Sequence, residues 1–240
     1  MKQENWYDVD TARGGDFSLS NAFPILMRKV FVWMTLALAI TGITAYGVAS
    51  SPTLVGMIFS SKVMFWGLII AEFGLVMAIS GAINRLSLAT ATLLFILYSV
   101  VNGATLSVVF LAYSTTVIAK TFFITAGTFG AMALVGYTTK TDLTSIGKLL
   151  FMALIGIIIA SVVNIFVGSS GLDLIISYVG VLVFVGLTAY DTQKIKEMCR
   201  IAPDAGESMQ KLALLGSLSL YLDFVNLFLY LLRIFGNNKD

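Results

Sequence analysis

Seven apolar runs, each longer than about 20 residues, dominate the sequence, and this is the length that a helix needs to cross the hydrocarbon core of a bilayer. The runs are 28–50, 63–83, 88–112, 118–138, 146–168, 173–193 and 211–235. They are too long, and too uniformly apolar, for strands of a membrane barrel. We therefore predict an all-α integral membrane protein. Its seven-helix transmembrane domain would cover 24–236, between a short cytoplasmic tail at 1–23 and a C-terminal tail at 237–240.

The overall composition excludes several classes of protein. Of 240 residues, 58% are hydrophobic and 12% are charged, whereas soluble domains carry about 25% charged residues. The net charge of +2 includes no basic patch, so we expect no nucleic-acid partner. The chain has no histidine and one cysteine, Cys199, which removes the usual general base, the usual zinc ligand and any internal disulfide. We expect no enzymatic activity, and any response to pH must come from carboxyl groups.

The basic residues predict an orientation. Eleven of the 15 Lys and Arg residues fall on the side of the N-terminus if all seven runs span, and the positive-inside rule then places the N-terminus in the cytoplasm. A six-span arrangement with a re-entrant last segment stays open. Pro24, Pro52 and Pro203 lie outside the runs, as expected if they mark helix ends and loops. We expect a monomer in a bacterial plasma (inner) membrane.

Small and amide side chains inside the runs predict how the helices pack. Glycines let helices approach closely, and six are candidates for this role: Gly42, Gly47, Gly127, Gly130, Gly180 and Gly186. Asn102 and Asn164 are expected to donate hydrogen bonds between helices rather than to form a site.

Three carboxylates lie in the apolar runs. Glu72 is near the middle of the second run, Asp191 ends the sixth, and Asp223 is midway along the seventh. An ionised side chain at membrane depth costs at least about 2.5–3.5 kcal/mol, so each is a candidate for function. The partner of Glu72 must come from another helix. Asp191, taken alone, fits a solvated helix end as well as a functional site.

The seventh run carries a polar stripe. Spacings of three and four place its polar and small residues on one helical face: Gly216, Ser219, Asp223, Asn226, Tyr230 and Arg233. The other directions are apolar, which suits a helix surrounded by other helices. We therefore predict that the seventh helix is central, and we favour a functional role for Asp223 over interhelical bonding alone.

A meeting of Asp191 and Asp223 would have a definite chemical consequence. Two carboxylates in a low dielectric cannot both ionise cheaply, so they would share a proton and titrate in two steps. Such a pair would sense pH without histidine. Its oxygens would also suit calcium, and protons and calcium would compete for them.

Two segments resemble a known family. Residues 190–195 (YDTQKI) and 217–228 (SLSLYLDFVNLF), followed by 231–233 (LLR), are similar to the signature segments of the Bax inhibitor-1 family, the transmembrane Bax inhibitor motif proteins. The resemblance implies a seventh helix wrapped by the other six. It also implies a pH-sensitive calcium leak with Asp191 and Asp223 as the sensor. Glu72 matches a family glutamate, and Arg85 is the candidate for an arginine that latches one sensor aspartate.

Three functions follow as hypotheses. The first is a proton-gated calcium leak channel, with Glu72 lining the path or forming a second acidic site. The second is a non-conducting protein that binds and regulates another membrane protein, such as a protease. The third, proton-coupled transport, ranks last because no inverted repeat or broken helix is evident. For the channel, an arginine latch predicts opening in acid, whereas a shared proton predicts opening in alkali.

Overall fold

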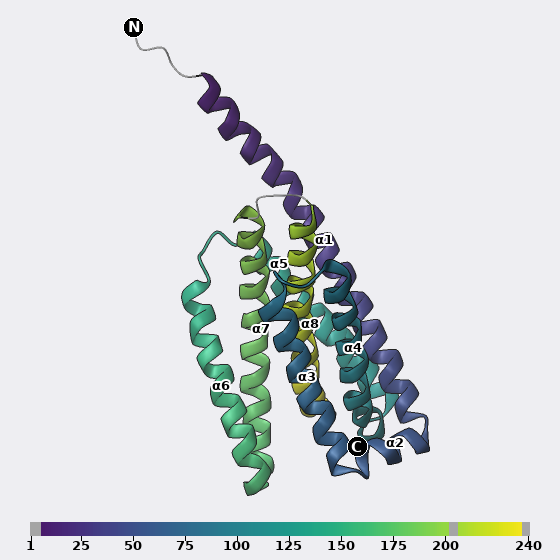
Figure 1. Ribbon diagram of the computed structural model, residues 1–240. Coiled ribbons are helices and arrows are strands. Elements are labelled where there is room, and N and C mark those ends of the chain that lie inside the picture. The colour runs from purple at the N-terminus through teal and green to yellow at the C-terminus, as the bar shows by residue number, and fades with distance from the viewer. Residues whose placement is uncertain (1–5, 202–205, 237–240) are drawn as a thin grey trace.

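The computed structural model describes residues 6–201 and 206–236, and its regular elements there are all helices (Figure 1). They are α1 (Trp6–Ala49), α2 (Pro52–Phe59), α3 (Lys62–Ala82), α4 (Leu88–Ala112), α5 (Thr115–Thr138), α6 (Thr144–Val167), α7 (Ser170–Ile201) and α8 (Glu207–Gly236). In these described residues, seven helices are long and apolar enough to cross a membrane, and α2 is a short connecting helix. The predicted all-α class and seven spans are confirmed. Because α8 runs without a break through the last apolar run, nothing supports the re-entrant alternative.

Helix α8 lies at the centre of the bundle, as predicted. It packs against α7, α1, α5 and α4, and it is the most buried of the seven spans. The resemblance implied that all six other spans wrap it, but α3 packs chiefly on α4, and α6 packs on α7 at the edge of the bundle (Figure 1). The bundle therefore has four helices around α8, with α3 and α6 in an outer layer.

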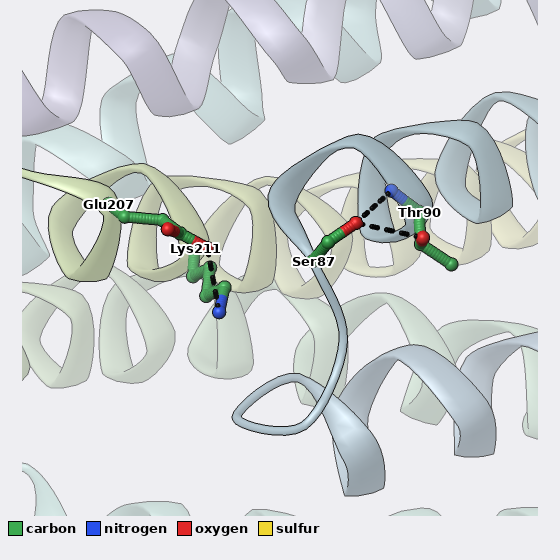
Figure 2. A network of polar contacts seen from close by, with 4 residues as sticks. All are labelled: Ser87, Thr90, Glu207 and Lys211. Carbon is green, nitrogen blue, oxygen red and sulfur yellow. Dashed lines mark hydrogen bonds and ion pairs between the residues drawn. The ribbon is translucent and has the colours of Figure 1, made fainter.

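Local sequence explains where the helices begin. Ser51, Ser61, Ser87 and Ser114 each precede a helix and accept a hydrogen bond from a backbone N–H in its first turn, which satisfies a donor that the helix leaves unpaired. At the start of α4, the Ser87 hydroxyl accepts from the Thr90 N–H at 3.1 Å (Figure 2). The first turn of α8 lies close by and carries a Glu207–Lys211 ion pair of 3.0 Å.

The three prolines differ in where they lie relative to the helices. Pro52 begins α2, where its missing N–H costs nothing. Pro24, by contrast, lies inside α1, which starts at Trp6, so the expectation that it lies outside a helix is wrong. A proline removes one backbone hydrogen bond, and at Pro24, the first residue of the span, water can replace it. Pro203 and the tail 237–240 lie outside the described residues, as do residues 1–5 of the predicted N-terminal tail.

The glycines at which helices approach closely are mostly not the six that were predicted. Gly180 meets the Tyr230 ring and Gly186 meets Leu150, as expected, but a Cβ added to any of the other four predicted glycines would meet nothing within 4 Å. Close approach occurs instead at Gly103 against α1, Gly136 against Ala189, Gly147 against the Tyr190 ring, and Gly216 against Ile195. The sequence reveals which residues are small, but the tertiary structure decides which helix face meets a neighbour.

Gly136→Ala should destabilise the bundle, because its Cβ would overlap the backbone carbonyl of Ala189 on α7. Overpacking of this kind costs about 1–3 kcal/mol, and for a chain of this size each kcal/mol lowers the melting temperature by about 2–4 °C. Thermal unfolding in detergent, followed by tryptophan fluorescence, measures the change. Gly127→Ala on the same helix is the matched control: its Cβ would meet nothing within 4 Å, so it should not lower the melting temperature; a similar loss in both variants would contradict the assignment.

Candidate functional site

Asp223 is buried in the middle of the bundle. It lies on the central helix α8 with 5% of its surface exposed. Its Oδ2 atom is buried and has no hydrogen-bond partner. A buried polar atom without a partner is costly, so the residue is not explained as a packing element.

Asp191 lies beside Asp223, on helix α7. The Ser219 hydroxyl donates a hydrogen bond to Asp191 Oδ2, and Ser219 precedes Asp223 by one turn of α8. The charges of the two aspartates interact. Among the described residues no direct hydrogen bond joins the two carboxyl groups, so Ser219 is the hydrogen-bonded link between α7 and α8 at this point. The structure thus brings together Asp191, Ser219 and Asp223.

The residues around Asp191 hold this end of α7 in place. Tyr190 packs its ring on Gly147 of α6. The Gln193 side chain donates to the Thr141 carbonyl and accepts from the Leu143 N–H, both at 2.8 Å, and so grips the α5–α6 loop. The motif that carried the family resemblance therefore serves mainly to fix the position of its aspartate.

The α5–α6 loop carries a carboxyl group, that of Asp142. Asp142 accepts a hydrogen bond of 2.8 Å from the Thr144 N–H. Hydrogen bonds from the side chain and backbone of Thr144 hold the pKa of the Asp142 carboxyl below its usual value. Asp142, in the loop that Gln193 contacts, therefore stays ionised at neutral pH.

The rest of the predicted polar stripe has other roles. The Asn226 amide donates to the Leu222 carbonyl of its own helix. Tyr230 stacks on Phe184 of α7, with ring centroids 5.9 Å apart. Further along α8, Arg233 forms an exposed ion pair of 3.5 Å with Asp173, at the start of α7. Asn226 and Tyr230 are thus not joined to the aspartates by hydrogen bonds.

Glu72 forms a separate polar cluster on the outer helix α3. The Asn102 amide of α4 donates to Glu72 Oε2 at 3.3 Å, so the partner comes from another helix, as expected. Oε1 is buried without a partner. Asn102 is therefore an interhelical donor as predicted, whereas Asn164 accepts from the Ser169 N–H in the turn before α7.

Sequence reasoning missed two members of this cluster. The Tyr221 hydroxyl of α8 lies 2.8 Å from Asn102 Oδ1 and 2.7 Å from the Thr41 hydroxyl of α1. The Tyr221 ring is held edge-on by Phe95 and Tyr98. A tyrosine hydroxyl in a central transmembrane helix needs a partner, and this was the signal available in the sequence.

The structure does not show the latch predicted for Arg85. Helix α3 ends at Ala82, and Arg85 lies exposed in the turn before α4. Its side chain makes no ion pair with any carboxylate among the described side chains. Among those side chains, no arginine holds Asp191 or Asp223.

Asp191, Asp223 and Ser219 do not by themselves make a complete calcium site. The described residues contain no group of three or more carboxylate, histidine or cysteine side chains that could hold a metal ion. Calcium prefers six to eight oxygen ligands, and Asp191, Asp223 and Ser219 supply fewer. A calcium ion here would keep much of its water and exchange readily.

An apolar cavity of about 120 Å³ lies between α1, α4, α5 and α8. Its lining includes Thr41 of α1 and Phe224, Val225 and Phe228 of α8. Neither Asp191 nor Asp223 lines it, and no residue of α7 does.

Comparison with known proteins gives a consistent result. Residues 24–240 match the family described as "Inhibitor of apoptosis-promoting Bax1". The inner membrane protein YbhL of Escherichia coli K12 is 50% identical over 214 residues, which cover 89% of this chain and 92% of that protein. An uncharacterized protein of Borreliella burgdorferi is also 50% identical, with the same coverage. One from Rickettsia prowazekii is 45% identical over 216 residues, covering 89% of this chain and 90% of that protein.

Asp223→Asn should raise the thermal stability at neutral pH, because it removes a buried group that is costly to ionise beside Asp191. We expect an increase in melting temperature of about 2 °C or more, since relief of such a cost is worth about 1 kcal/mol or more. The control is Asp173→Asn, which removes an exposed carboxylate of α7 and should change the melting temperature little. A marked loss of stability in Asp223→Asn would assign the carboxylate a structural role instead.

Proposed function

The chain belongs to the Bax inhibitor-1 family of multi-pass membrane proteins, and from that premise we propose that it is a pH-sensitive calcium leak channel gated by protonation of Asp191 and Asp223. The observation that carries the proposal is a carboxyl group buried in the central helix with one oxygen unpartnered, next to a second carboxyl group. Such an arrangement costs stability and is retained most simply for function.

The pair would work as a sensor through its net charge. With one proton on the pair, repulsion is relieved and attraction for a divalent cation is weak. Loss of that proton leaves two negative charges in a low dielectric, which attract calcium and repel one another. Because no arginine among the described side chains latches either aspartate, we take the shared-proton branch and expect the leak to rise with pH.

The apolar residues around α8 would supply the barrier of the closed channel. Phe224, Val225 and Phe228 line an apolar cavity between α8 and the helices α1, α4 and α5. Apolar constrictions block ions while they are dry. In this proposal, repulsion at the aspartates loosens α7 from α8 and lets water reach the centre of the bundle. Glu72 would serve as a second acidic site.

The location follows from the relatives. YbhL is described as an inner membrane protein, and we place this chain in the plasma (inner) membrane of a bacterium. The excess of basic residues on the side of the N-terminus favours a cytoplasmic N-terminus. The proposal involves no enzymatic step.

A calcium flux assay tests the channel. Purified full-length protein in liposomes that contain a calcium-sensitive dye should leak faster at alkaline than at acidic pH. Asp191→Asn and Asp223→Asn should each flatten this profile or shift its midpoint by about one pH unit or more. Asp173→Asn, which alters a carboxylate at the other end of α7, should retain the wild-type profile.

A wild-type pH profile in both variants of the pair would reject the sensor. An absence of flux at every pH, together with a membrane protease that co-purifies stoichiometrically, would instead support the second hypothesis, a non-conducting regulator.

Arg85→Ala should leave the pH profile unchanged, because the Arg85 side chain is exposed and makes no ion pair with the aspartates among the described side chains. The same liposome assay measures it. A leak that becomes insensitive to pH in Arg85→Ala would show that a latch forms in another state of the channel.

A further inference from the structure

A second polar cluster joins four helices through one chain of hydrogen bonds. Thr41 of α1 meets Tyr221 of α8 at 2.7 Å, Tyr221 meets Asn102 of α4 at 2.8 Å, and Asn102 meets Glu72 of α3 at 3.3 Å. Thr41, Tyr221 and Asn102 are all buried. The proposed function uses Glu72 as a second acidic site but gives Thr41, Tyr221 and Asn102 no role, and no hydrogen bond connects this chain to Asp191 or Asp223 in the described residues.

The hydroxyl groups in this hydrogen-bond chain have fewer protons than contacts. Thr41 also lies 3.0 Å from the carbonyl of Ser99, so the hydroxyls of Thr41 and Tyr221 take part in three contacts. Each hydroxyl carries one proton, so the two hydroxyls can donate in only two of the three contacts. Which two are filled depends on the group at the end of the hydrogen-bond chain.

Glu72 is the end that can set the direction. When Glu72 is ionised, the Asn102 amide nitrogen donates to it, and the Asn102 oxygen accepts from Tyr221, as in the structure. Tyr221 then needs no acceptor beyond Asn102. Thr41 is free to donate either to Ser99 or to Tyr221.

Protonation of Glu72 favours the reversed direction. A proton on Oε1 would find no hydrogen-bond partner in the described residues, whereas a proton on Oε2 can be donated to the Asn102 oxygen once the amide turns over, which places the amide nitrogen next to Tyr221. The nitrogen donates to the Tyr221 oxygen, so the Tyr221 proton must go to Thr41, and the Thr41 proton goes to the Ser99 carbonyl. Every contact is then satisfied, and Thr41 has become the necessary acceptor.

We propose that Thr41, acting through Tyr221 and Asn102, is a positioning residue that sets the charge state of Glu72, although it lies two side chains away from it. The inference goes beyond the proposed function, since it concerns the protonation of Glu72 whether or not ions pass. It predicts that the Thr41 hydroxyl stabilises the protonated form of Glu72 more than the ionised form.

Few other groups act on Glu72. Helix α3 packs on α4 and α2, and α2 has no titratable side chain. On α4, Tyr98 is the titratable residue, and it interacts electrostatically with Glu72, as does Tyr221. Thr105 lies beside the carboxylate, but its hydroxyl proton is donated to the Val101 carbonyl of its own helix at 3.3 Å. Neither tyrosine ionises near neutral pH, so the polarity of the chain is the variable that remains.

The test follows the carboxyl band of Glu72 by infrared difference spectroscopy during a pH titration of the full chain in lipid nanodiscs. Glu72→Gln identifies the band. Thr41→Val keeps the shape of the side chain but leaves the Tyr221 proton without an acceptor in the protonated state. We expect it to lower the midpoint of the Glu72 titration by about one pH unit.

Three matched variants separate this effect from a change in packing. Thr41→Ser keeps the hydroxyl and should restore the wild-type midpoint. Thr125→Val removes a buried hydroxyl that bonds only within α5 and should not move it. In a Tyr221→Phe background, Thr41→Val should have no further effect, because the link between Thr41 and Glu72 is already broken.

The proposal is overturned if Thr41→Val leaves or raises the midpoint, if Thr41→Ser shifts it equally, or if the shift persists with Tyr221→Phe. A Glu72 band that does not titrate in the wild-type protein over the pH range in which it stays folded would also overturn it. Because the readout is a carboxyl band and not calcium flux, failure here is distinct from failure of the proposed channel.

Discussion

The position of a carboxyl group in the central helix is the constraint on which the rest of the structure depends. Asp223 is withdrawn from water by the helices that surround α8, and its neighbourhood offers one more carboxylate and one serine rather than a cation. A bundle built for stability alone would place an apolar residue there. Two contacts of α7 hold Asp191 in place beside Asp223. Ala189 packs on Gly136 of α5, and Gln193 donates a hydrogen bond to the α5–α6 loop.

Three residues of α8 serve two different polar clusters. Ser219 and Asp223 are one turn apart and meet Asp191 on α7, whereas Tyr221 lies between them in the sequence and points to another face of the helix, where it meets Thr41 and Asn102. A central helix can do this because it has neighbours on every side. The acidic pair and the hydrogen-bond chain to Glu72 are therefore both held by α8.

Much of the fold could be predicted from the sequence, and less of the site. Length and hydropathy predicted the seven spans, and the polar stripe predicted a central α8, because both depend on residues close together in the chain. The stripe predicted a larger site than the structure shows: Asn226 donates to its own helix, and Tyr230 stacks on Phe184, about two turns of α7 away from Asp191. Tyr221 was missed because its partners come from α1 and α4, far away in the sequence.

By itself, the sequence determined that the chain crosses a membrane, that its possible proton-binding groups near neutral pH are carboxyls, and that three of them lie at membrane depth. Only the tertiary structure decided that Ser219 links Asp191 to the helix of Asp223, that Arg85 stays outside, and that Glu72 connects to α1 through two buried side chains. The physical reason is that hydropathy acts on each helix separately, whereas a hydrogen bond between helices depends on how far each is rotated about its own axis, and packing between neighbours determines that rotation.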